Sequence, residues 1–228
     1  MINVAMVNRS SSITDHTASA TIPAFQAWLD NFLVPAWGLD QVKLSYVAGH
    51  EEAVHGEWPV YLLETSDVPG AGGYHEDVGA VPDGKVFVGD AIKYGISWTV
   101  DFSHELAEML VDPMTDRWVP VGHMPGWDVI VEVGDPVEAD QLGHMVAGVL
   151  MTDFVLPKYF GLATPASQPA AMNGLFDCLG HIDQGVPGLL PGGYVSLRNP
   201  HGRIRQLFAR QLNNQISRRA ARPGRIFR

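Results

Sequence analysis

The spacing of apolar residues near the start of the chain predicts a strand followed by a helix. Ile2, Val4 and Met6 alternate along the sequence, with the period of a β-strand. Residues 22–34 then carry apolar side chains at the helical spacing, namely Phe25, Trp28, Leu29, Phe32 and Leu33. Pro35, with Gly38 beyond it, predicts the end of this helix because proline disrupts a helix interior.

The middle of the chain is typical of short strands arranged around one more helix. The predicted strands are Val42–Val47, Val60–Glu64, Lys85–Val88, Trp127–Val133 and Met145–Thr152. The helix spans about Thr99 to Asp112, and residues 161–200 are rich in proline and glycine. This order of elements predicts a single α+β domain with a mixed sheet over residues 1–200.

The end of the chain, residues 201–228, reads as a basic appendage to that domain. Its apolar residues predict an amphipathic helix over Ile204–Arg219, with the stripe Ile204, Leu207, Phe208, Leu212 and Ile216. The apolar face of this helix could pack on its own domain or dock on another chain. Arginines fill the other face and the tail beyond.

Charge is divided sharply between the body of the chain and its end. The 228 residues carry a formal net charge of −10. Residues 1–197 hold six Lys and Arg and all 25 acids, a net charge of −19, whereas residues 198–228 hold nine arginines and no acid. Arginines of this kind suit an acidic protein surface, so we expect a protein partner or another copy of this chain. Nucleic acid is disfavoured because the body is acidic and no aromatic residues alternate with the arginines.

Sequence features bearing on the compartment are few. Cys178 is the single cysteine, so no internal disulfide can form. The first residues lack the basic and apolar regions of a signal peptide, and no apolar run reaches the roughly 18–20 residues of a membrane span. We therefore expect a soluble protein that does not use a membrane and is not secreted by a signal peptide.

The second predicted helix carries the densest group of reactive side chains. It reads His-Glu-Leu-Ala-Glu-Met-Leu-Val-Asp-Pro over residues 104–113. His104 and Glu108 lie one turn apart on one face, with Glu105 beside them. Two ligands at this spacing can coordinate one metal ion, and a Glu directly after the first ligand can activate the water bound to that ion. The alternative is a solvated polar face with no metal.

The sequence departs from the His-Glu-x-x-His pattern of zinc peptidases, because Glu108 stands at the second histidine. Carboxylates do bind zinc, and an oxygen-rich site would also accept calcium or manganese. Asp112, one turn further on, is the leading third ligand. Other residues that the fold could bring near instead are Asp116, His123, Glu132 and Asp135. Acids near a helix C-terminus are unfavourable by roughly 0.3–1 kcal/mol, which a bound cation would offset.

Several stretches together resemble an uncharacterised family of bacterial and phage proteins marked by a Ser-His-Glu-Leu-x-Glu-Met-Leu-x-Asp-Pro helix. That helix corresponds here to residues 103–113. Supporting stretches, in order along the chain, are residues 7–10, 35–38, 73–75, 84–87, 94–100, 132–138, 153–160 and 191–194. The helix is also similar to the His-Glu-x-x-Glu helix of plant phosphate-induced proteins. The resemblance ends near residue 200, before the basic appendage.

The resemblance implies a zincin-like fold, because members of the family are described as metallopeptidase-like or virion-associated. One expectation is a metal-binding component of a phage virion, located in the virion or the host cytoplasm, with its basic end bound to a neighbouring subunit. The other is an active zinc-dependent peptidase or amidase. In that enzyme His104, Glu108 and Asp112 would hold Zn²⁺, and Glu105 would be the catalytic base.

Two further expectations concern the surroundings of such a site. A substrate could add as a strand along residues 85–88 if these form a sheet edge. His75, within Gly73-Tyr74-His75, could lie on a strand near the cleft as an extra ligand or substrate contact. Its alternative is an ordinary loop histidine.

Overall fold

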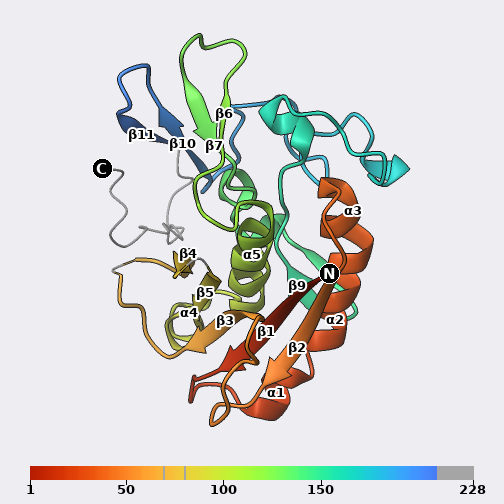
Figure 1. Ribbon diagram of the computed structural model, residues 1–228, viewed down its shortest axis with the longest axis vertical. Helices are drawn as coiled ribbons and strands as arrows, with labels where there is room; N and C mark the ends of the chain where they lie inside the picture. Colours follow the sequence, from red (N-terminus) through yellow and green to blue (C-terminus); the bar gives the residue numbers. More distant parts are fainter. Residues whose placement is uncertain (69, 80, 210–228) are drawn as a thin grey trace.

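The computed structural model describes residues 1–68, 70–79 and 81–209, which form an α+β fold around a mixed five-stranded sheet (Figure 1). The strands are β1 (Ile2–Asn8), β2 (Val42–Val47), β3 (Trp58–Leu63), β4 (Gly73–Val78) and β5 (Val81–Phe87). Their order is β2-β1-β3-β5-β4. All neighbours are parallel except β4, which runs antiparallel to β5 and forms one edge of the sheet.

The predicted first helix is longer than the sequence indicates, because it passes through Pro35. It follows a short helix α1 (Asp15–Ser19) and consists of α2 (Ile22–Trp28), a π-helical turn (Leu29–Leu33) and α3 (Val34–Trp37). In the π-helical turn the N–H of Val34 bonds to the carbonyl of Leu29, five residues back. This wider turn accommodates a proline without a break. The helix ends at Gly38, whose φ of 62° is the left-handed conformation that glycine tolerates.

The helix predicted over Thr99–Asp112 is confirmed as α5 (Trp98–Val111), and a shorter helix α4 (Val88–Tyr94) precedes it. Helix α5 lies at the centre of the molecule, between the five-stranded sheet and the C-terminal half of the described chain (Figure 1). Every residue from Val100 to Val111 is buried. A helix covered on all sides must bury its polar residues as well as its apolar ones.

The C-terminal half consists of short strands and turns. A second, antiparallel sheet has the order β11-β10-β7-β6, built from β6 (Trp118–Pro120), β7 (Asp128–Ile130), β10 (Tyr194–Arg198) and β11 (Ile204–Phe208). The elements between β7 and β10 are β8 (His144–Val146), β9 (Val149–Met151) and 3₁₀ turns at Asp135–Val137, Asp140–Leu142, Pro157–Phe160 and Ala170–Met172. None of the helices within the described ranges has the length and apolar character that a membrane span requires.

Two predictions for this half are wrong in their local structure. The single strand over Met145–Thr152 is instead the hairpin β8–β9, because Ala147 and Gly148, with φ of 47° and 85°, form a tight turn. The amphipathic helix over Ile204–Arg219 is wrong at its start, because Ile204–Phe208 pair with β10 as strand β11. The remainder of that predicted helix, from residue 210, lies outside the described residues.

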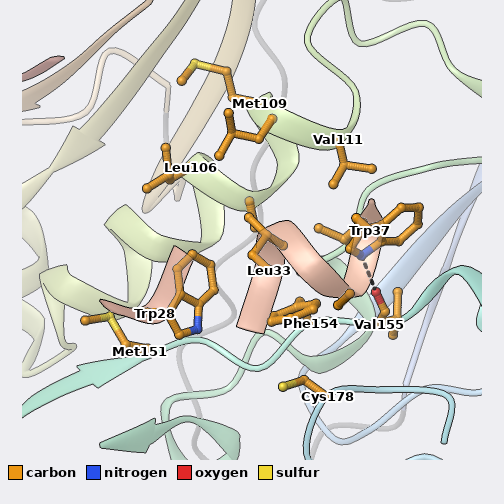
Figure 2. Close-up of a cluster of buried hydrophobic side chains, with 14 of the residues drawn as sticks. Trp28, Leu33, Trp37, Leu106, Met109, Val111, Met151, Phe154, Val155 and Cys178 are labelled. Carbon is orange, nitrogen blue, oxygen red and sulfur yellow. Dashed lines mark hydrogen bonds between the residues drawn. The ribbon is translucent and has the colours of Figure 1, made fainter. Parts of the chain in front are cut away.

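The core joins the two halves through one face of α5 (Figure 2). Leu106 and Met109 of α5 lie in the same buried cluster as Trp28 and Leu33 of the first helix. The extended chain after β9 packs into this cluster too: Trp28 meets Phe154 edge-on at 5.7 Å between ring centroids. The indole N–H of Trp37 donates to the carbonyl of Val155 at 3.1 Å. These contacts fix the orientation of α5, and with it the opposite, polar face.

Candidate metal centre

The polar face of α5 places a cluster of ionisable side chains inside the protein. Asp101, His104, Glu105 and Glu108 are each 3–5% exposed. Buried charges are costly unless they are paired or bound to a metal. No Lys or Arg is buried in residues 1–209, positions 69 and 80 aside. Positive charge for these carboxylates must therefore come from histidine, protons or a bound cation.

His104, Glu108 and Asp135 form the first group that could hold a metal ion. His104 Nε2 lies 3.4 Å from Glu108 Oε1 and 3.5 Å from Asp135 Oδ1. The backbone N–H groups of Gly134 and Asp135 donate to Glu108 Oε1 at 3.1 and 3.3 Å. A Cβ at Gly134 would lie 2.4 Å from His104 Nδ1, so glycine is needed for the ring to approach this backbone. The loop after β7 thus orients two of the three side chains.

His75, Glu105 and Glu108 form a second group, which shares Glu108 with the first. His75 comes from the edge strand β4 and is 4% exposed. Its Nδ1 lies 3.6 Å from Glu105 Oε2 and 4.0 Å from Glu108 Oε2. Its Nε2 lies 3.1 Å from the backbone carbonyl of Asp112. A carbonyl only accepts hydrogen bonds, so Nε2 carries the proton and donates it.

Asp112, the predicted third ligand, lies in neither group, and Asp135 stands beside His104 and Glu108 instead. Asp112 ends α5 with non-helical φ and ψ of −131° and 67°, so its side chain does not continue the line of the helix. One of its carboxylate oxygens accepts the N–H groups of Asp116 and Arg117, at 3.0 and 3.1 Å. The side chain thus stabilises the turn after α5, and the backbone carbonyl positions His75.

Of the other four residues that the sequence offered as ligands, two are buried and two are exposed. Asp135 is 3% exposed and lies in the first group. Glu132 is also 3% exposed, but it lies in neither the first nor the second group. Asp116 and His123 are exposed. Of the two histidines that the sequence offered near the site, His75 is therefore the one that the fold brings to α5.

The electrostatics of the site reflect an excess of buried negative charge. Burial opposes protonation of His104, but Glu108, Asp135 and Glu105 outweigh this and raise its pKa well above the usual value. Burial, helped by Glu108, raises the pKa of Asp135 to about 7. Burial also raises the pKa of Glu105. Without a metal, the site retains protons to reduce its negative charge.

A third group, Asp153, Asp177 and His181, lies elsewhere in the chain after β9. Asp177 accepts the N–H groups of His181 and Ile182, both at 2.8 Å, and His181 Nδ1 lies 3.0 Å from Asp153 Oδ2. Burial, with the neighbouring Asp177, raises the pKa of Asp153 to about 9. A proton shared by two buried carboxyls explains this arrangement without a cation.

The raised pKa of Asp153 has a predictable effect on how the stability of the fold depends on pH. Between its ordinary pKa of 3.8 and its folded pKa of about 9, the folded state holds a proton that the unfolded state has lost. The contribution of Asp153 to the free energy of unfolding therefore falls as pH rises, by up to about 1.4 kcal/mol per pH unit. We expect Asp153→Asn to flatten the curve of unfolding free energy against pH, measured by urea denaturation in chelator. The exposed Asp40→Asn is the control, and parallel curves for Asp153→Asn and wild type would contradict the assignment.

Comparison with protein-family models, curated proteins and solved structures finds no match to this chain. The assignment of the centre rests on its geometry. The described residues show buried His, Glu and Asp groups that could hold a metal ion.

Proposed function

We propose that the protein binds a divalent metal ion through His104, Glu108 and Asp135. The observation that carries the proposal is the pair of distances from His104 Nε2, 3.4 Å to Glu108 and 3.5 Å to Asp135. Tetrahedral ligands at about 2.1 Å from an ion lie about 3.4 Å from one another. Both distances are also longer than a good hydrogen bond, so the spacing suits an ion better than direct contact.

The donor set favours zinc or another first-row transition ion over calcium. His104 supplies an imidazole nitrogen, which zinc and its neighbours accept readily. Calcium takes six to eight oxygen ligands and seldom a histidine. Two carboxylates and one neutral histidine give a ligand charge of −2, which one divalent ion balances.

The arrangement of the sheet supports a zincin-like domain as part of this proposal. A His-Glu helix packs on a mixed sheet whose edge strand β4 is antiparallel, and β4 contributes His75. The strand expected to receive substrate, around residues 85–88, is internal: β5 lies between β3 and β4. The sheet edge beside His75 is β4.

Burial of the ligands favours a structural role for the ion. His104, Glu108 and Asp135 are only 3–5% exposed. Structural metal sites are closed, whereas catalytic sites keep one position open to water and substrate. We therefore propose that the ion joins α5 to the loop after β7 and stabilises the fold.

The test is the metal content of protein purified without chelator, measured by inductively coupled plasma mass spectrometry. We expect at least one zinc or similar ion per folded chain in wild type, and its loss from the His104 site in His104→Ala. His50→Ala is the matched control because the side chain of His50 is 80% exposed. Folded wild-type protein that neither contains nor takes up a divalent ion would overturn the proposal.

A zinc-dependent peptidase is the second candidate, supported by one observation. A small cavity beside the centre is lined by Gly72, Gly73, Asp101, His104 and Glu105. A water there would lie between the His104 site and Glu105, the predicted base. In this case Glu105→Gln would abolish hydrolysis of a peptide library and leave the ion at His104 in place.

A further inference from the structure

We propose that the centre is dinuclear, with a second divalent transition ion held by His75, Glu105 and Glu108. The carboxylate of Glu108 would bridge the two ions. This inference rests on the proposed function, because it places the first ion at His104, Glu108 and Asp135. The two ligand groups are both buried and have Glu108 in common.

The two oxygens of Glu108 face different groups. Oε1 lies 3.4 Å from His104 Nε2 and accepts the backbone N–H groups of Gly134 and Asp135. Oε2 lies 4.0 Å from His75 Nδ1. A carboxylate whose two oxygens face different ligand groups can bind one ion through each oxygen. In two-metal sites the ions are about 3.5–4 Å apart, a distance that a bridging carboxylate spans.

The hydrogen bond of His75 turns a ligand atom toward the second site. Because Nε2 donates to the Asp112 carbonyl at 3.1 Å, the neutral ring has its lone pair on Nδ1. That lone pair faces Glu105 Oε2 at 3.6 Å and Glu108 Oε2 at 4.0 Å. A proton on Nδ1 would be poorly shared over such distances. An ion between the three atoms would be bound by all of them, and a backbone carbonyl such as that of Asp112 is a common outer partner of a metal-bound histidine.

The edge strand is built to lie close to α5 at this point. A Cβ at Gly73 would lie 2.6 Å from Glu105 Cγ, and one at Gly72 would lie 2.9 Å from Asp101 Oδ1. The register of β4 on β5, with Gly73 opposite Val86 and His75 opposite Gly84, then fixes the position of His75. The two glycines thus bring His75 to Glu105 at a distance that a strand with larger side chains could not reach.

Charge also favours two ions over one. The carboxylates of Glu105, Glu108 and Asp135 supply three negative charges, and neutral His75 and His104 supply none. One divalent ion leaves a net charge of −1 on these ligands, with the buried Asp101 close by at the cavity. Two ions supply four positive charges, which the three ligand carboxylates and the nearby buried Asp101 and Glu138 more than offset. The mixed nitrogen and oxygen donors suit Zn²⁺, Mn²⁺ or Fe²⁺.

The experiment is a titration of the metal-free full-length chain with Zn²⁺, followed by calorimetry and by metal analysis after desalting. We expect two ions per wild-type chain and one per chain in His75→Ala and in His75→Gln. His50→Ala should keep two. One ion in wild type, with no change in the His75 variants, would overturn the dinuclear centre and leave the proposed function standing. No ion in wild type would overturn both.

A measurement on wild type alone decides the matter if the His75 variants do not fold. Protein loaded with Mn²⁺ is expected to give the exchange-coupled electron paramagnetic resonance spectrum of two ions that share a carboxylate. The six-line spectrum of isolated Mn²⁺ at saturating metal would contradict the proposal.

Discussion

Chelation is expected to lower the free energy of unfolding by at least about 4 kcal/mol. This is the contribution of a ligand present at about 1,000 times its dissociation constant, and structural zinc sites commonly exceed it. For a chain of this size the loss corresponds to a fall in melting temperature of roughly 8–16 °C. The cause is the buried negative charge around α5, which only protons and two histidines offset once the ion is gone.

Differential scanning calorimetry with and without a strong chelator provides the measurement. Restoring Zn²⁺ should restore the melting temperature, whereas Mg²⁺, which prefers water and oxygen ligands, should not. His104→Ala should melt at the same temperature in both conditions if His104 holds the only stabilising ion, and with a smaller difference than wild type if two ions contribute. Equal melting temperatures for wild type with and without chelator would contradict a structural ion.

Gly134→Ala is expected to cost about 1–3 kcal/mol of stability and to weaken metal binding 10–100-fold. The new methyl group would lie 2.4 Å from His104 Nδ1 and 2.6 Å from Cε1, so the ring or the loop must move. Crowding of a packed interior has about this energetic cost, and displaced outer contacts weaken metal sites by about this factor. The backbone itself accepts alanine, since φ and ψ of Gly134 are −86° and −35°.

The control is Gly122→Ala, where the added Cβ has no atom within 4 Å and where φ is not in the left-handed region. It should match wild type in unfolding free energy and in Zn²⁺ affinity by calorimetry. If Gly134→Ala also bound Zn²⁺ with wild-type affinity, the packing of His104 on this loop would not control the metal site.

The sequence predicts local structure and the spacing along α5 well, because both depend on near neighbours. The helical period places His104 and Glu108 one turn apart, and the structure confirms that both project to the same buried group. The α+β class and five of the strands in the described residues, β1, β2, β3, β5 and β7, follow from alternating or apolar runs. Pro35 misleads because the helix reaches it through a π-helical turn, which the spacing of apolar residues does not predict.

The partners of α5 could not be read from spacing, because they come from distant parts of the chain. Asp135 reaches His104 only through the loop after β7, and His75 through the register of an edge strand. Asp112 stands one turn beyond Glu108 in the sequence, but α5 ends there, so its side chain does not lie with those of His104 and Glu108. Gly134 and the pair Gly72-Gly73 carried the missing signal, since a glycine can mark a place where the backbone approaches other groups closely. The spacing of apolar residues over Ile204–Phe208 fits a helix, and these residues form a strand because they pair with β10, a contact that local spacing does not reveal.

The assembly role remains a prediction based on the division of charge. Most of the arginines of the basic end lie in residues 210–228, outside the described residues. Strand β11, which leads into them, holds Leu207 and Phe208 at 44% and 38% exposure. Removal of residues 210–228 alone would test the role and leave strand β11 in place.

The position of β4 at the sheet edge has a consequence for the timing of metal exchange. Among the residues that the structure describes, strand β4 pairs with β5 alone and covers the face of α5 that carries Glu105. Local opening of this edge would uncover an ion bound beneath it, so we expect conditions that promote opening to speed exchange. The protein should therefore acquire its ion as it folds and then hold it over many rounds of dilution, even where the equilibrium affinity is moderate.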